Sequence, residues 1–225
     1  MELEEELRRK IAQIQPLDER AMALAKKRWD SIAHPLHSLG LLEDAIVTIA
    51  GAQGSHQVEL NKRCVTPFCA DNGVVAQGVT QSGQDVTTIV TKNFCIGEAS
   101  VCVMARVAGA DVIPVDIGVA QDVTEPGLRV HKIAYGTADI TQGPAMTREQ
   151  AADAILYGMN LVKELKEEGY RLIATGEMGI GNTTTSSALL SVLLHRPVEE
   201  MTGRGAGLSS EGLKRKIDAI HRAIE

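Results

Sequence analysis

The hydrophobic and polar positions of the chain repeat with two different spacings, and these spacings predict the elements. Apolar side chains recur at helical spacing over several long segments, which predicts amphipathic helices. Short and nearly continuous apolar runs stand between them, and such runs are typical of buried strands. The predicted helices cover residues 2–14, 18–32, 39–52, 84–94, 99–108, 147–168 and 209–224. The predicted strands cover residues 64–70, 111–119 and 171–175.

Residue types that commonly cap helices stand at several of these boundaries. Asp18 lies where an N-cap would begin the second helix. Thr147 and Gln150 occupy the two positions of a capping box at the start of the sixth helix. Gly51 and Gly54 are expected to end the third helix, because glycine readily takes the conformation that follows a helix.

Short apolar strands that alternate with long helices predict an α/β fold, with a parallel sheet covered by helices on both faces. A long polar loop is expected over residues 120–146, which are rich in Gly, Thr and Pro. The last helix is expected to turn one apolar face to the core. That face carries Leu213, Ile217, Ile220 and Ile224.

Composition and charge exclude several classes of protein. The chain has 225 residues, of which 44% are hydrophobic, 23% charged and only 3% aromatic, so the core must be built from aliphatic side chains. The net charge of −6 and the lack of a basic stripe argue against a nucleic-acid partner. No apolar stretch approaches the ~20 residues of a membrane span, so no membrane partner is expected. The acidic start, Glu-Leu-Glu-Glu-Glu after Met1, is unlike a signal peptide.

The thiol and imidazole side chains favour an intracellular protein without a metal site. The four cysteines stand in apolar settings without C-x-x-C spacing, so we expect reduced, mostly buried thiols and a cytoplasmic location. They are Cys64, Cys69, Cys95 and Cys102. The closest histidine pair is His34 and His37, and Pro35 between them favours a turn over a metal-binding helix face.

Carboxylates stand at three predicted strand ends. Asp71, Asp116 and Glu177 each follow an apolar run. Ligands of parallel sheets gather outside the carboxyl ends of the strands, so the three together are candidates for a binding site. Each of them could instead be an ordinary turn or cap residue.

The segment ATGEMGIGNTTTSSALL, residues 174–190, places Glu177 among glycines at a strand-to-helix junction. Glycines beside a helix start let backbone N–H groups approach an anion, and the helix dipole favours negative charge there. Neither a P-loop nor a G-x-G-x-x-G pattern is present. The simpler interpretation is a glycine-assisted turn capped by Asn182 or Thr183.

A second glycine-rich turn follows in TGRGAGLSSEGLKRK, residues 202–216, just before the last predicted helix. Three cationic residues, ending with Lys216, come soon after it. A phosphate would repel Glu177, so the carboxylate should face another part of the ligand, such as ribose hydroxyls or a developing cation. Two glycine turns, a carboxylate and a cation suit a phosphoribosyl ligand.

At these motifs the chain resembles the nicotinate-nucleotide–dimethylbenzimidazole phosphoribosyltransferase family, from about residue 10 to its end. The resemblance rests on GEMGIGNTT, GRGAGL, ADNGVVAQGVTQSGQDVT and IPVDIGV. It implies transfer of the phosphoribosyl group of nicotinate mononucleotide to 5,6-dimethylbenzimidazole or a related base. The products are α-ribazole 5′-phosphate and nicotinate, in the synthesis of the lower ligand of cobalamin. No cofactor or metal is implied.

The family resemblance also implies the domain organisation and a homodimer. Family members have a Rossmann-like domain and a smaller helical domain made from both ends of the chain. Residues 1–60 are therefore expected to form part of the helical domain. Residues 61–225 are expected to form the Rossmann-like, phosphoribosyl-binding domain, truncated at its C-terminal end.

Site residues follow from the resemblance position by position. Glu177 matches an active-site carboxylate near the ribose, and Lys216 matches a lysine on the phosphate side. Ser82 matches a residue that lines the pocket of the base. With the strand-end carboxylates, the expected substrate-binding residues are Ser82, Gly179, Gly181, Asn182, Thr183, Gly205, Lys216, Asp71 and Asp116.

The chain departs from the family pattern in three places. The general base of the family is a glutamate in a later G-E-G-type segment, which this chain lacks, so we expect weak turnover by the chain alone. Val90 stands where some relatives place a polar pocket residue, and Asn72 replaces the histidine of a D-H-G turn.

A nucleotide-binding fragment or regulatory subunit without catalysis is therefore an alternative. A metal-dependent hydrolase that uses Asp71, Asp116 and the histidines is a weaker one, since no ligand spacing supports it.

Overall fold

The computed structural model describes residues 2–225 and divides the chain into two compact units. The smaller unit covers residues 5–61. The larger unit covers residues 2–4 and 62–225. Every predicted site residue belongs to the larger unit.

The smaller unit is helical. Its helices α2 (Glu19–Asp30) and α3 (Leu41–Gln53) pack against each other, and α1 (Glu2–Ile11) precedes them in the chain. The side chain of Asp18 accepts the backbone N–H of Ala21 at 2.9 Å. Asp18 is therefore the N-cap of α2, as the sequence predicts.

One boundary prediction in this unit is wrong. Gly51 lies inside α3, and a Cβ atom there would come within 2.7 Å of the Met22 side chain on α2. The glycine thus permits close packing of two helices and does not end one. Gly54 is the C-cap, with a left-handed φ of 64°.

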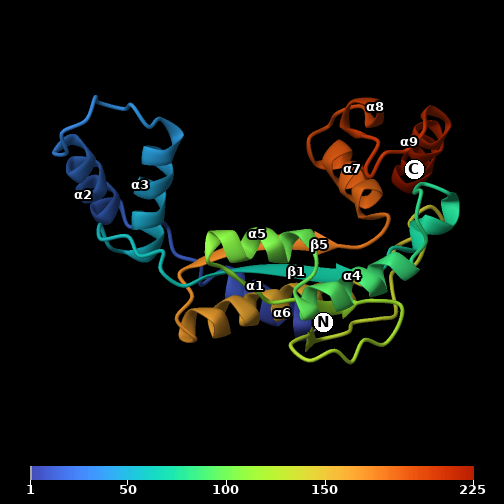
Figure 1. The fold of residues 1–225 in the computed structure, drawn as a ribbon. Coiled ribbons are helices and arrows are strands. Elements are labelled where there is room, and N and C mark those ends of the chain that lie inside the picture. Colours follow the sequence, from blue (N-terminus) through green and yellow to red (C-terminus); the bar gives the residue numbers. More distant parts are fainter. Residues whose placement is uncertain (1) are drawn as a thin grey trace. The chain divides into compact units, whose positions relative to one another are not determined.

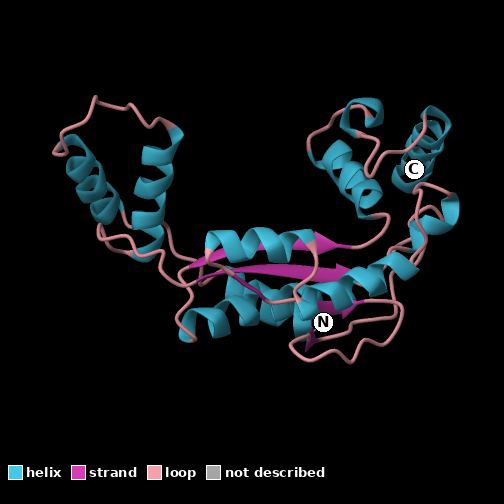
Figure 2. Ribbon diagram, viewed as in Figure 1, coloured by secondary structure: helices cyan, strands magenta, loops and turns pink. Residues whose placement is uncertain are grey.

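A parallel sheet forms the centre of the larger unit (Figure 2). Strand β1 pairs along one side with β5, and on its other side first with β2 and then with β3. Strand β4 extends the sheet beyond β3. All four pairings are parallel, which confirms the predicted sheet type. The strands are β1 (Arg63–Ala70), β2 (Asp111–Val112), β3 (Val115–Gly118), β4 (Arg129–Val130) and β5 (Leu172–Met178).

Three details of the sheet differ from the prediction. The single strand expected over residues 111–119 is two strands, interrupted beside Pro114, which has no N–H to give to a ladder. The expected loop over residues 120–146 contains the short strand β4. Strand β5 runs to Met178 rather than ending at Thr175, so Glu177 belongs to the strand itself.

Helices cover both faces of the sheet, as predicted (Figure 1). Helices α4 (Asp85–Ile96) and α5 (Ser100–Ala108) lie on one face, and α6 (Arg148–Glu167) lies on the other. The capping box predicted from Thr147 and Gln150 is present at the start of α6.

The core on the α4 and α5 face contains Cys69, Phe94, Cys102, Val119 and Val123. The core on the α6 face contains Cys64, Val115, Leu161, Leu165 and Tyr170.

A helical cluster follows β5. It consists of α7 (Asn182–Leu193), α8 (Val198–Met201) and α9 (Ser210–Ile224), with the 3₁₀ helix η1 (Gly73–Gln77) against α9. The buried face of α9 differs from the predicted one, because Ile224 is 40% exposed. The buried residues of α9 are Gly212, Lys216, Ala219 and Ile220.

The cysteine prediction is confirmed for the placement of the thiols. All four are free, and Cys95 alone is only partly buried. Among residues 2–225, none of the helices is long and apolar enough to cross a membrane.

Burial of Tyr170 and its hydrogen bond to Asp111 predict that the stability of the fold depends on pH in the alkaline range. The Tyr170 hydroxyl donates to Asp111 Oδ2 at 2.7 Å, and burial together with this bond raises the pKa of Tyr170 to about 12. A phenol in the unfolded chain titrates near pH ~10. The folded protein therefore binds the phenol proton more tightly than the unfolded chain does. The resulting contribution of Tyr170 to the free energy of unfolding is complete below pH ~10 and is lost as the pH rises toward about 12.

We expect Tyr170→Phe to remove this pH dependence. In urea unfolding at pH 9 and pH 11.5, the free energy of unfolding of the wild type should fall more between the two pH values than that of the variant. Equal losses in both proteins would show that Tyr170 does not titrate differently in the folded state.

Candidate functional site

Six of the predicted binding residues line one small cavity in the larger unit. The cavity has a volume of about 140 Å³ and lies beyond the carboxyl end of β5, between the 179–181 turn and the second glycine turn. The six are Ser82, Gly179, Gly181, Asn182, Thr183 and Gly205. Residues that are far apart in the sequence thus meet where a parallel sheet is expected to bind its ligand.

The first glycine turn brings the start of α7 to this cavity. Gly179 lies so close to β1 that a Cβ atom there would be 2.1 Å from the Ala70 carbonyl oxygen. Gly181 is the N-cap of α7, with a left-handed φ of 93° and no side-chain cap. The interpretation that Asn182 or Thr183 caps the helix is therefore wrong. The N–H groups of Asn182 and Thr184 donate to the carbonyl oxygens of Gly179 and Gly181, at 3.0 and 2.9 Å. Because no side chain caps the helix start, its positive dipole end is available to an anion.

Lys216 adds a buried positive charge beside the turn. Its side chain is almost fully buried, at 1% exposure. Its Nζ donates to Thr183 Oγ1 at 2.8 Å and to the Gly203 carbonyl oxygen at 3.1 Å. Burial lowers the pKa of Lys216. Within residues 2–225 no carboxylate lies within 4.0 Å of this ammonium group, which has three N–H donors for these two acceptors.

A buried charge without a counter-ion is unfavourable unless a ligand supplies the opposite charge. The sequence predicted Lys216 as a cation near the turns but did not predict that it is buried. Its placement on the inner face of α9, four residues after Gly212, explains the burial.

Glu177 lies beside the cavity rather than in its wall. In the sheet register it stands opposite Phe68, whereas the following residue, Met178, stands opposite Cys69 and lines the cavity. Successive strand side chains point to opposite faces of a sheet, so Glu177 faces away from Met178. Its side chain is exposed, and its carboxylate makes no hydrogen bond or ion pair within residues 2–225.

The structure does not bring the other two strand-end carboxylates to the cavity. Asp71 and Asp116 are both fully buried. Asp71 Oδ2 accepts the N–H of Ala120 at 2.8 Å, and Asp116 Oδ1 accepts the N–H of Val119 at 2.9 Å. Lys132 Nζ lies 2.8 Å from Asp116 Oδ2 in an ion pair. Both carboxylates therefore hold the chain that follows β3, which is the turn interpretation left open by the sequence.

Sequence reasoning missed several residues of the cavity wall. Arg204 contributes a second cation to the cavity, and its guanidinium group donates to the Leu208 carbonyl oxygen at 2.7 Å. Its place between Gly203 and Gly205 was a usable signal, because an arginine in an anion-binding turn is a common phosphate ligand. The other wall residues not predicted are Val79, Thr80, Gln81, Met178, Ile180, Ala206 and Leu208.

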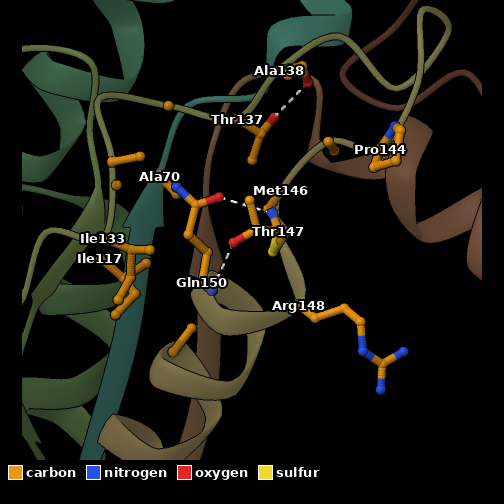
Figure 3. Close-up of a pocket in the computed structure, with 15 residues that line it drawn as sticks. Ala70, Ile117, Ile133, Thr137, Ala138, Pro144, Met146, Thr147, Arg148 and Gln150 are labelled. Atoms are coloured by element: carbon orange, nitrogen blue, oxygen red, sulfur yellow. Dashed lines mark hydrogen bonds between the residues drawn. The ribbon is translucent and has the colours of Figure 1, made fainter. Parts of the chain in front are cut away.

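A larger cavity of about 570 Å³ lies at the start of α6 (Figure 3). Its polar side chains are already engaged: Thr147 and Gln150 bind each other in the capping box, and Thr137 donates to the Ala138 carbonyl oxygen. Arg148 points away from the cavity in Figure 3 and pairs with Glu4. None of the predicted site residues lines this cavity, so the smaller one is the better candidate for a phosphorylated ligand.

The metal-dependent alternative finds no geometric support. Among residues 2–225, no group of three or more His, Cys, Asp or Glu side chains could hold a metal ion. His34 and His37 instead face the carboxylate of Glu43, at 3.4 and 3.7 Å.

Comparison with known proteins identifies the family of the chain. A family model described as "Phosphoribosyltransferase" matches residues 14–225. The chain belongs to this phosphoribosyltransferase family. The match covers both glycine turns, Glu177 and Lys216.

Two relatives are named nicotinate-nucleotide–dimethylbenzimidazole phosphoribosyltransferase. The one from Acetivibrio thermocellus is 47% identical over 204 residues, which are 91% of this chain and 58% of the relative. The one from Ruminiclostridium cellulolyticum is 45% identical over 215 residues, which are 96% of this chain and 61% of the relative. The chain thus spans only 58% to 61% of the length of these phosphoribosyltransferases.

A solved structure has the same fold. The crystal structure of CobT from Thermus thermophilus superposes with a TM-score of 0.86 at 41% identity. The match covers 91% of this chain and 62% of that protein. The likeness in fold therefore extends over nearly all of this chain.

Proposed function

We propose that the chain binds nicotinate mononucleotide and transfers its phosphoribosyl group to 5,6-dimethylbenzimidazole or a related base. The products would be α-ribazole 5′-phosphate and nicotinate, in the synthesis of the lower ligand of cobalamin. The observation that carries this proposal is the buried ammonium group of Lys216, beside an uncapped helix start and without a carboxylate partner within residues 2–225. The names of the relatives support the choice of substrates.

The cavity supplies the binding part of this reaction. The positive dipole end of α7 and the ammonium group of Lys216 would hold the phosphate, with Arg204 at the same cavity. A cavity of about 140 Å³ holds only part of a nucleotide, so the ribose would extend past the end of β5 toward Glu177.

Glu177 would supply the electrostatic part. The bond between C1′ and the nicotinate nitrogen breaks, its electron pair stays on that nitrogen, and the benzimidazole nitrogen forms the new bond to C1′. Positive charge builds on the ribose during this exchange, and a fixed carboxylate stabilises it more in the transition state than in the ground state. The attacking base also loses its N–H proton, for which a general base is worth ~10²–10⁴-fold.

A second candidate function is nucleotide binding without turnover. Among residues 2–225, no aspartate or glutamate lines the cavity. Glu177 beside it is a single carboxylate, whereas the reaction calls for one group that stabilises the charge on the ribose and one that accepts the proton of the attacking base. A chain with this site alone would bind the nucleotide as a fragment or regulatory subunit of the same family.

One pair of measurements tests the proposal. Calorimetry with the 225-residue protein should show binding of nicotinate mononucleotide and much weaker binding of nicotinate riboside, which lacks the phosphate. Chromatography should then show nicotinate release only when dimethylbenzimidazole is added. Binding without release would select the second candidate, and no binding would contradict both.

A homodimer and a cytoplasmic location belong to the same proposal. Exposed apolar side chains on α5, Val103, Met104 and Val107, offer a face for self-association. The four free thiols are consistent with a reducing compartment. Sedimentation of the protein at several concentrations would test the dimer.

A further inference from the structure

Both backbone polar groups of Ile180, at the centre of the first glycine turn, are held by side chains from other elements. The N–H of Ile180 donates to Thr87 Oγ1 at 3.1 Å. Its carbonyl oxygen accepts a hydrogen bond from Asn72 Nδ2 at 3.2 Å. Thr87 belongs to α4 and Asn72 follows β1, so the turn is fixed from two directions.

These two anchors are themselves held in place. Thr87 is fully buried and Asn72 is 8% exposed. Gln84 Nε2 donates to the Asn72 carbonyl oxygen at 3.2 Å, and Thr91 Oγ1 donates to the Thr87 carbonyl oxygen at 2.7 Å. Each anchor therefore presents its polar group to the turn from a fixed position.

The turn touches its anchors closely. A Cβ atom on Gly179 would lie 3.0 Å from Asn72 Nδ2, and one on Gly181 would lie 3.3 Å from Asn72 Cβ. Asn72 thus packs against both glycines that flank Ile180. With Thr87 on the other side, little room is left for the turn to take a second conformation.

We propose that Asn72 and Thr87 are positioning residues that fix the 179–181 turn and, with it, the place and direction of the N-terminal end of α7. They touch the turn and not the ligand, since neither lines the cavity. A ligand that binds to a preformed turn does not have to order it, so losing an anchor weakens binding without removing any ligand contact. The inference rests on the proposed binding of nicotinate mononucleotide at this turn.

The chain offers a matched pair of variants to test it. Thr87 and its neighbour Thr88 are both buried on α4, but the Thr88 hydroxyl has no hydrogen-bond partner within residues 2–225. Thr87→Val and Thr88→Val make the same chemical change at the same depth. The first leaves the Ile180 N–H without its acceptor, and the second removes a hydroxyl that holds nothing.

We expect Thr87→Val to weaken binding of nicotinate mononucleotide about threefold to tenfold, the equivalent of one ordinary hydrogen bond. Thr88→Val should bind as the wild type does, and Thr87→Ser, which keeps the hydroxyl, should restore binding. Hydrogen exchange without ligand adds an independent readout. The Ile180 amide should exchange faster in Thr87→Val and at the wild-type rate in Thr88→Val.

The outcomes separate this inference from the proposed function. A wild type that does not bind nicotinate mononucleotide contradicts the proposed function. A wild type that binds, with Thr87→Val equally tight or with Thr88→Val equally weakened, contradicts only the positioning role. If Thr87→Val does not fold, Asn72→Ala removes the other anchor, and wild-type affinity in that variant would overturn the inference.

Discussion

Glu177→Gln is expected to lower the rate of nicotinate release by about 100-fold or more, the scale on which one electrostatic group stabilises a transition state. The affinity for nicotinate mononucleotide should stay the same or increase, because the substitution removes a negative charge near the bound phosphate. The structure adds an expectation for stability. The carboxylate is exposed and makes no hydrogen bond or ion pair within residues 2–225, so the melting temperature should change little.

A structural role for Glu177 would give the opposite pattern. Turnover per folded molecule would survive while the melting temperature fell. Glu98→Gln is the matched control, since Glu98 is also exposed and the net charge changes equally. Steady-state kinetics, calorimetry and thermal unfolding of both variants distinguish the roles. A Glu177→Gln variant with nearly wild-type turnover would end the catalytic interpretation.

Lys216→Met should weaken binding of nicotinate mononucleotide by about 1–3 kcal/mol, or roughly fivefold to 150-fold, the range for a lost charge-assisted hydrogen bond. Methionine keeps most of the length of the side chain but carries no charge. Nicotinate riboside has no phosphate, so it should bind equally to the wild type and the variant. Lys214→Met on the exposed side of α9 is the control and should change neither affinity.

The affinity should also depend on pH through Lys216. Burial lowers the pKa of this ammonium group from the ordinary value of 10.5, so more than half of the unliganded protein has lost the charge once the pH reaches 10.5. Nucleotide affinity in the wild type should therefore decline over that alkaline range, and the decline should be absent in Lys216→Met. Calorimetry in which Lys216→Met matches the wild type for both ligands would show that Lys216 does not hold the phosphate.

Local chemistry was enough to predict much of the fold. The caps at Asp18 and Thr147 depend on neighbouring residues only, and both are present. The parallel sheet follows from short apolar runs between long helices. The prediction failed at Gly51, where a small residue serves the packing of α3 against α2, because packing between helices is not visible in local spacing.

Six of the predicted binding residues line one cavity, but the sequence did not predict the geometry around them. The two glycine turns and Lys216 are adjacent in the structure, as their composition suggested. Which way a carboxylate at a strand end points depends on the register with the next strand. Asp71, Asp116 and Glu177 therefore looked alike in the sequence, although two are buried in backbone hydrogen bonds and one is exposed.

The anchors Asn72 and Thr87 were beyond sequence reasoning for a related reason. Their hydrogen bonds reach across 108 and 93 residues of chain to Ile180, and no local pattern marks such a pairing. A buried threonine in a helix is ordinary until its partner is known. Thr88, with the same side chain and nearly the same burial, has no such partner within residues 2–225.

These long separations have a consequence for the order in which the protein folds. The 179–181 turn needs Asn72 and Thr87 from earlier in the chain, and Thr183 needs Lys216 from 33 residues later. Contacts between distant residues close large loops and form slowly, so the turn should acquire its native shape only after β1, α4, β5 and α9 have come together. Recovery of nucleotide binding during refolding should therefore lag behind the recovery of helical signal, and the ligand would report on the last contacts that the larger unit makes.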